Sequence, residues 1–392
     1  MATIEKYETS RGETRYMVRY RKPDHTSTKK RGFTRKKDAQ EWLAQHAVID
    51  IRQGTYTDPT LGRTTIGQVR DEWWRQRKPF LRPSTQRTIE SSWATHIAPT
   101  WAGTPLNRIT NNDVQTWVSG LAQRRSPSIT REAYRQLRQI IDHAVANNYL
   151  PRSPITRVTV PSKPKTKRRR VYLTIGQLVQ FADQAACARH NGRERRALIL
   201  TLGLCGLRWG EAAGLHVDDI DFPGNRITIR RSVSQLGSRH VEGPPKNGAS
   251  RSIPMPRLVA GALMEVTRGR RDDATVFTDP DGTPIRTQTV STSKSNRTWW
   301  PSALKRCGWP HSRWPSPHDL RHTAASIAIH AGANVKAVQR MLGHANASMT
   351  LDVYADLFDV DLDSVAVSID DAVSRETGER AQNVPKNKKE DR

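Results

Sequence analysis

Hydrophobic and polar residues recur with a different period in each of three stretches of the chain. In the first stretch they alternate, as they do in a half-buried β-strand. Residues 14–21 (TRYMVRYR) alternate and are rich in Tyr and Val, and residues 28–33 can return as a second strand after a turn at Pro23. Over residues 36–52 the apolar positions recur at helical spacing. Residues 1–58 are therefore predicted to form a β-hairpin–helix module.

The second stretch has the spacing of amphipathic helices. Dipeptides that contain proline or asparagine separate its apolar segments from one another. Bulky aromatic residues in these segments are expected to fill a core: Trp73, Trp93, Trp117 and Tyr134. Residues 64–160 are therefore predicted to form a helical bundle, with helices near 65–77, 84–97, 110–123 and 127–147.

The third stretch follows a proline-rich linker at residues 161–170 and mixes both periods. Residues 226–233 and 251–254 are predicted strands around a loop rich in Gly and Pro. Predicted helices begin at Thr174 and cover 194–205, 256–268, 287–306, 319–330 and 335–342. This region is taken as residues 171–375, and the polar tail, residues 376–392, is predicted to be disordered. The chain is thus predicted to be multidomain and mainly α with small β-sheets, its third domain being α+β.

The composition of the chain indicates the kind of partner that it binds. The 392 residues include 64 Lys+Arg against 38 Asp+Glu, a net charge of +26, which favours a polyanion such as nucleic acid. More than half of the excess lies in residues 59–170, so the helical bundle and linker are expected to grip phosphates.

Two absences bear on location. No run approaches 18 apolar residues, and the first residues lack the apolar segment of a signal peptide, which argues against a spanning helix and secretion. The three widely spaced cysteines fit reduced thiols, so a cytoplasmic, nucleoid-associated protein is expected.

The candidate chemistry lies in the third region, where separate polar signals occur in a fixed order. An arginine follows an apolar helix in GLRWGE, a lysine lies in the loop PPKNGAS, and HDLRH places a histidine and an arginine three residues apart. Residues spaced i, i+3 share a helical face, so these two can point at one anion. A Leu-Gly-His segment and a tyrosine follow. The six residues are Arg208, Lys246, His318, Arg321, His344 and Tyr354.

In this order and spacing the chain resembles the tyrosine recombinase family, the phage integrases and their relatives. The resemblance is close over residues 170–360 and looser over the helical bundle, which is similar to a core-binding domain (SAM-like). The N-terminal module is similar to the arm-binding domain of integrases. The resemblance implies a site-specific recombinase that integrates or excises a mobile element through a 3′-phosphotyrosyl intermediate. It also implies a homo-tetramer on double-stranded DNA with core and arm attachment sites, a host DNA-bending factor and an excision factor.

The chemistry accounts for the residue types. Two guanidiniums, Arg208 and Arg321, can stabilise the negative charge that builds on a phosphodiester under attack. Tyr354 is the expected nucleophile, and Lys246 is the candidate general acid for the departing 5′ oxygen. The resemblance implies that His318 assists proton transfer around Tyr354 and that His344 hydrogen-bonds the phosphate. No cofactor or metal is expected, since the chain has neither a GxxxxGK[ST] sequence nor a convincing carboxylate cluster.

Two sets of cations are candidate DNA contacts. The first set lies on the predicted N-terminal strands, which can enter a DNA groove or form a solvated sheet face. The second set ends the linker and is expected to contact the phosphate backbone. The sets are Arg19, Arg21, Lys29, Lys30 and Arg31, and Lys167, Arg168, Arg169 and Arg170.

Some neighbouring residues are predicted to be structural. His322, directly after Arg321, is interpreted as a buried structural histidine, and Glu211 as a residue that holds helix or arginine geometry. The Cys187–His190 and Cys307–His311 pairs have ligand-like spacing without a matching second pair, which argues against zinc.

Several alternatives stay open at this point. A type IB topoisomerase shares the active-site logic, and a Xer-like resolvase shares the family, but neither is expected to need the N-terminal module. A non-catalytic DNA-binding protein built on a decayed recombinase is disfavoured by the complete set of six residues. The apolar segment after Tyr354 can dock on a neighbouring protomer or fold back in cis.

Overall fold

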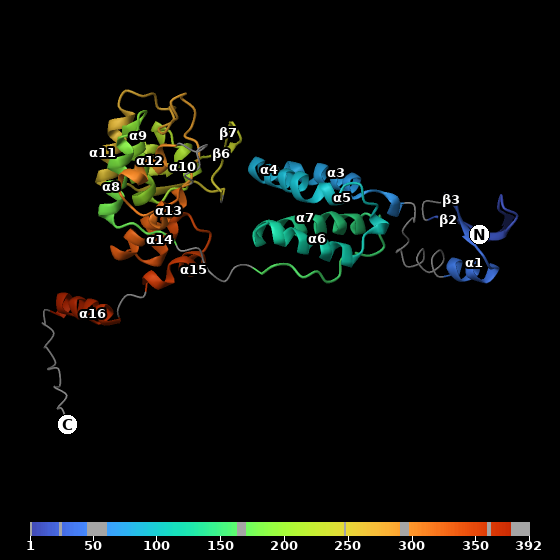
Figure 1. Ribbon diagram of the computed structural model, residues 1–392. Helices are drawn as coiled ribbons and strands as arrows, with labels where there is room; N and C mark the ends of the chain where they lie inside the picture. The colour runs from blue at the N-terminus through green and yellow to red at the C-terminus, as the bar shows by residue number, and fades with distance from the viewer. Residues whose placement is uncertain are drawn as a thin grey trace. The chain divides into compact units, whose positions relative to one another are not determined.

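The computed structural model describes residues 2–22, 26–44, 61–162, 170–246, 248–290, 298–358 and 362–377. The chain divides into two compact units, residues 1–167 and 168–392 (Figure 1). No helix among the described residues is long and apolar enough to cross a membrane.

The first unit begins with a three-stranded antiparallel sheet, in the order β1-β2-β3, and not with a hairpin alone. Its strands are β1 (Thr3–Glu8), β2 (Thr14–Arg21) and β3 (Ser27–Phe33), and helix α1 (Lys36–Trp42) packs on one face. Val18, Tyr20 and Ala39 form the small core. The sequence pattern missed β1 because TIEKYE carries a single aliphatic residue, Ile4. The part of the predicted helix beyond residue 44 lies outside the described residues.

The register of this sheet sorts its cations onto two faces. Arg19 lies opposite Lys29, Met17 opposite Arg31 and Arg21 opposite Ser27, so Arg19, Arg21, Lys29 and Arg31 share the face away from α1. Lys30 lies opposite Val18, on the face that packs against α1. All five predicted cations are exposed.

The helical bundle follows in the same unit. Its long helices are α3 (Ile66–Arg77), α4 (Pro83–Ser92), α6 (Asn111–Arg124) and α7 (Pro127–Ala146), close to the predicted bounds. Thr65 and Thr110 close capping boxes at the starts of α3 and α6. The helix expected to stop before Pro99 instead continues through a π-helical turn (Trp93–Ile97) into α5 (Ala98–Trp101), with Pro99 in its first turn. Trp73 and Trp117 are buried in the core, and Trp93 and Tyr134 pack against it.

The second unit is built around one buried helix. This helix, α9 (Gly192–Cys205), is covered by α8 (Ile175–Ala186), α11 (Arg257–Thr267) and α13 (Pro317–His330). Residues Ala197 to Leu202 of α9 are all buried, which is why this stretch is apolar apart from Thr201, whose hydroxyl donates to the carbonyl of Ala197. The short helix α12 (Trp299–Arg306) packs on α8.

Two small antiparallel sheets complete the second unit. The first has the order β4-β5-β8, and β6 and β7 form a separate hairpin. The strands are β4 (Ile220–Asp221), β5 (Arg226–Ile229), β6 (Ser232–Leu236), β7 (Arg239–Gly243) and β8 (Arg251–Pro254). The strand predicted over 226–233 is therefore two strands. The chain leaves one sheet for the other at Arg230-Arg231, whose guanidiniums pair with Asp218 and Asp219.

Three further helices follow α13: α14 (Val335–Leu342), α15 (Ala347–Phe358) and α16 (Leu362–Thr377). The helix predicted over 287–306 begins only at Trp299, and residues 285–290 have no helical structure. Polar Thr and Ser residues dominate the start of that predicted helix, so it had no apolar face to bury. The tail predicted to be disordered from 376 overlaps α16 at its first two residues, and the rest lies outside the described part.

The predicted fold class is confirmed: the chain is mainly helical, with small antiparallel sheets. The functional names given to its regions remain predictions.

Candidate active site

The end of α9 positions the first arginine. Gly206 ends the helix in the left-handed conformation at φ +70°, and a Cβ there would lie 2.9 Å from a methyl group of Leu342. The chain therefore passes close to α14 before Arg208 begins α10 (Trp209–Ala213). The backbone N–H of Arg208 donates to Oε2 of Glu211 at 2.9 Å, and its Nη1 donates to Oε1 at 2.8 Å.

Glu211 joins two arginines that are far apart in sequence. Arg251 of β8 donates from Nη1 to Oε1 at 2.9 Å and from Nη2 to Oε2 at 2.6 Å, a two-pronged ion pair with a side chain that is 1% exposed. Burial alone would raise the pKa of Glu211, but the hydrogen bonds and charges of Arg251 and Arg208 lower it to about 2. Glu211 therefore stays ionised and holds both guanidiniums.

Arg321 of α13 completes the cationic group. It is 3% exposed, and it donates from Nη1 to the carbonyl of Gly206 at 2.6 Å and from Nη2 to the carbonyl of Leu342. Burial and the charge of Arg208 lower the pKa of Arg321 to about 9. Arg208 and Arg251 thus share one buried carboxylate, Glu211, and Arg321 lies within reach of its charge, so the three guanidiniums leave an excess of positive charge that an anion can neutralise.

The loop after α14 supplies His344. Gly343 ends α14 at φ +62°, and a Cβ there would lie 3.0 Å from Cδ of Arg251, so a larger residue would crowd the arginine. The His344 ring bonds through Nδ1 to the hydroxyl of buried Thr350 at 2.9 Å. Burial and the three arginines lower the pKa of His344 to about 4, which keeps the ring neutral at pH 7.

A cavity of about 490 Å³ opens onto this group. Arg208, Arg251 and His344 line it, together with residues of the β7–β8 loop. Lys246 itself is exposed on that loop, and its neighbours Pro245 and Ala249 line the cavity. The structure therefore brings Arg208, Arg321 and His344 together and leaves the Lys246 side chain at the surface beside them.

Helix α13 carries the histidines toward the tyrosine. A capping box of Ser316 and Asp319 starts the helix, which presents His318 and, one turn later, His322, with their ring centroids 4.8 Å apart. Burial and the charge of Arg321 lower the pKa of His318. Tyr354 of α15 is 1% exposed, and burial raises its pKa to about 12. Its hydroxyl bonds to Nδ1 of His322 at 2.7 Å.

This contact adds to the interpretation of His322 as a buried structural histidine, because its half-buried ring bonds the hydroxyl oxygen of the expected nucleophile. The sequence signal was its spacing of four residues from His318, which puts both on one helical face. Arg251 was also missed, although it lies five residues after Lys246 on the returning strand.

Of the four candidate DNA-binding cations at the end of the linker, the structure describes Arg170. Arg170 is half-buried, and its charge acts on His318, His322 and Tyr354. Lys167, Arg168 and Arg169 lie outside the described residues. Cys205 and Cys307 are buried free thiols, Cys187 is exposed, and no cluster of His, Cys, Asp or Glu suited to a metal occurs among the described residues.

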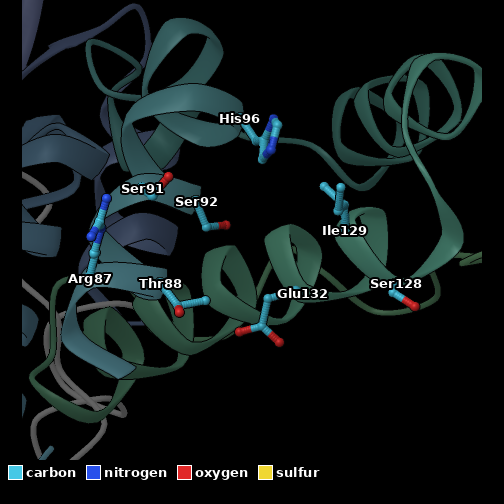
Figure 2. Close-up of a pocket in the computed structure, with 8 residues that line it drawn as sticks. All are labelled: Arg87, Thr88, Ser91, Ser92, His96, Ser128, Ile129 and Glu132. Atoms are coloured by element: carbon cyan, nitrogen blue, oxygen red, sulfur yellow. The ribbon is translucent and has the colours of Figure 1, made fainter. Parts of the chain in front are cut away.

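The first unit has a hollow of its own, far from these residues in sequence. Figure 2 shows it between α4 with the π-helical turn on one side and α7 on the other, at about 440 Å³. The residues that line it are Arg87, Thr88, Ser91, Ser92, His96, Ser128, Ile129 and Glu132. None of these was among the predicted site residues.

Comparison with known proteins matches both regions. Residues 172–360 match the phage integrase family, and residues 66–160 match the phage integrase central domain. A tyrosine recombinase XerC-like protein of Caldanaerobacter subterraneus subsp. tengcongensis is 25% identical over 83% of this chain and 87% of its own length. A putative prophage phiRv2 integrase of Mycobacterium tuberculosis is 26% identical over 81% of this chain and 82% of its own.

Among solved structures, the Tn1549 transposon integrase in complex with circular intermediate DNA is similar to this chain. The TM-score is 0.61 at 22% identity, over 79% of this chain and 100% of that one. This likeness is one of fold.

Replacing Glu211 by Gln should destabilise the second unit by about 3–5 kcal/mol at pH 7, because the buried guanidiniums lose their shared anion. The pKa of Glu211 is depressed in the folded chain from 4.5 to about 2, so its contribution is complete above pH 4.5 and is lost as the pH falls toward 2. Denaturant unfolding at several pH values measures both effects.

The control is Glu265→Gln, since Glu265 pairs with Arg193 at the surface. We expect Glu265→Gln to change the free energy of unfolding little. Equal losses in the two variants would show that Glu211 is not the centre of the cluster.

Proposed function

The chain belongs to the phage integrase family of tyrosine recombinases, and from that premise we propose that its six predicted residues cut and rejoin DNA. The protein is a site-specific DNA recombinase, an enzyme that transfers DNA strands. The observation that carries the proposed mechanism is the pair of guanidiniums, Arg208 and Arg251, that one buried carboxylate holds at the edge of a cavity, with Arg321 near enough to be influenced by their charges. The residues are Arg208, Lys246, His318, Arg321, His344 and Tyr354.

Arg208 and Arg321 bind the scissile phosphate. Glu211 and backbone carbonyls hold their guanidiniums before DNA arrives, so little reorganisation is needed when charge builds on the non-bridging oxygens. The neutral ring of His344 adds a hydrogen-bond donor through its Nε2 once Nδ1 accepts the hydroxyl hydrogen of Thr350. A phosphate neutralises the excess positive charge, which gives DNA a reason to bind at this point.

Tyr354 attacks the phosphorus, and the 5′ oxygen leaves. The phosphotyrosyl bond conserves the energy of the phosphodiester, since a phenol is a good leaving group when a new 5′ hydroxyl attacks. Lys246 protonates the departing oxygen. Its exposed place on a loop beside the cavity suits a group that reaches the phosphate only when DNA is bound. His318 assists proton transfer around Tyr354.

The remaining cations bind DNA away from the chemistry. The open face of the N-terminal sheet, which lies away from α1, carries Arg19, Arg21, Lys29 and Arg31. This face is proposed to contact arm sites. The linker cations from Lys167 to Arg170 and the helical bundle are proposed to contact core sites along the phosphate backbone. A host DNA-bending factor and an excision factor, and association with the nucleoid in the cytoplasm, belong to the same proposal.

We propose a tetramer as the assembly. Exchanging two duplexes requires four strand cleavages, and each protomer offers one tyrosine. The described apolar residues of α16, Val367, Ile369 and Val373, are about half exposed, which favours docking of this segment on a neighbouring protomer over folding back in cis.

The alternatives fit less well. The chain matches integrases over both of its matched regions, and its N-terminal sheet gives it a basic surface that relaxation of DNA by a topoisomerase does not need. A Xer-like resolvase remains the nearest alternative, since a XerC-like relative covers most of the chain. A binding assay with distal arm DNA distinguishes the integrase from the resolvase, because arm binding is expected of the integrase alone.

Tyr354→Phe should abolish covalent protein–DNA adducts on a nicked suicide substrate that carries candidate attachment DNA, and should leave DNA affinity unchanged, because only the nucleophilic oxygen is removed. Denaturing gel electrophoresis detects the adduct. The matched control is Tyr172→Phe, a tyrosine whose ring lies near His322 but has no proposed role in attack. Adducts that persist in Tyr354→Phe would contradict the assignment.

The double substitution Arg21→Ala with Lys29→Ala should weaken binding to arm DNA and lower its salt dependence by about one unit of slope for each cation removed. Lys30→Ala is the matched control, because Lys30 lies on the opposite face of the same sheet. Affinity measured across a range of salt concentrations gives the slopes. A larger effect from Lys30→Ala than from the double variant would show that the open face does not bind DNA.

A further inference from the structure

The nucleophile of the proposed reaction has one described hydrogen-bond partner. Tyr354 Oη lies 2.7 Å from Nδ1 of His322, and the tyrosine is 1% exposed within a cluster of Ala325, Ile329, Val338 and Leu342. Apolar side chains therefore surround the ring, and within the described part of the chain water has little access to this hydroxyl. A group that removes the phenolic proton has to be in contact with it already.

His322 is better placed for this than His318. The His318 ring lies edge-on to that of His322, with centroids 4.8 Å apart, and no hydrogen bond joins His318 to Tyr354 in the described structure. The His322 ring lies 5.6 Å from the Tyr354 ring by centroid, with its Nδ1 on the hydroxyl. The distance of 2.7 Å is within the range over which a proton passes between a donor and an acceptor.

We propose that His322 is the catalytic base for Tyr354. In cleavage the Tyr354 oxygen bonds to phosphorus, its proton passes to Nδ1 of His322, and the bond from phosphorus to the 5′ oxygen breaks, with a proton supplied from the other side by Lys246. In rejoining, the imidazolium returns its proton to the tyrosine oxygen as that oxygen leaves. This inference rests on the proposed role of Tyr354 as the nucleophile.

The surroundings of His322 explain why the proton does not move earlier. Burial lowers the pKa of His322 to about 4, and His318, Arg170 and Arg321 act in the same direction, against Asp319. Burial also raises the pKa of Tyr354 to about 12, so the resting pair is neutral and the tyrosine donates to the imidazole. Tyr172 is the other aromatic neighbour of the ring.

The arrival of DNA changes both sides of this balance. A phenol oxygen that is bonding to phosphorus loses its affinity for a proton, and the negative phosphate held by Arg208 and Arg321 favours a cation on His322. The transfer therefore accompanies attack and is not completed before it. A resting chain without a bound phosphate would keep its nucleophile protonated.

The test compares adduct formation by His322→Asn and His322→Phe with the wild-type chain. Asparagine can place an acceptor oxygen near the position of Nδ1 but cannot take up a proton at neutral pH, whereas phenylalanine removes both abilities. His330→Asn on the same helix is the matched control, because within the described residues the His330 ring bonds the carbonyl of Ser326 and not Tyr354. Each variant is measured on a nicked substrate with an ordinary 5′ oxygen and with a 5′ bridging sulfur, which leaves without a proton.

We expect both His322 variants to form adducts about 10²-fold or more slowly on both substrates, with DNA affinity unchanged and His330→Asn normal. A near-normal rate for His322→Asn would overturn the proposal, since an acceptor without proton uptake would then suffice. Recovery of both variants on the sulfur substrate would overturn it too, by assigning His322 to the leaving group. A wild-type chain that forms no Tyr354 adduct would instead refute the proposed function.

Discussion

The buried ion pairs of Glu211 are the interaction on which the rest of the site depends. One carboxylate, 1% exposed, binds Arg208 from the end of α9 and Arg251 from β8. Arg321 lies close enough for the charges of all three groups to shift its pKa. A buried charge is costly unless it is paired, so the ion pairs of Glu211 favour the packing of the end of α9 against β8. Among the described residues, three guanidiniums against one carboxylate leave an excess of positive charge that a bound anion can neutralise.

In the proposed mechanism the protein separates holding DNA from cutting it. The charge excess is densest over residues 59–170, whereas the candidate site lies in a nearly balanced unit, where backbone carbonyls or Glu211 fix the guanidiniums of Arg208, Arg251 and Arg321. Two left-handed glycines, Gly206 and Gly343, allow the arginines to lie against α14 without a side chain in the way. Packing of α13 and α15 against α14 then places His322 and Tyr354 beside the same group.

Much of the fold followed from the sequence because its signals are local. Helical spacing and starts such as Thr174 predicted most helices to within a few residues, and the ordered motifs pointed to a candidate site in the third region. Arg251 and His322 were missed because their importance arises from contacts across 40 and 32 residues of chain, which no local pattern records. Strand β1 was missed because its sequence, TIEKYE, has too few apolar residues to show the alternation of a half-buried strand.

In the proposed mechanism a guanidinium held in a fixed orientation, and not positive charge alone, stabilises the phosphate under attack. The cleavage rate of Arg208→Lys on a suicide substrate measures this, since lysine keeps the charge and loses the planar fork. We expect a loss of about 10²-fold or more with DNA affinity little changed. A cleavage rate close to that of the wild-type chain would contradict it.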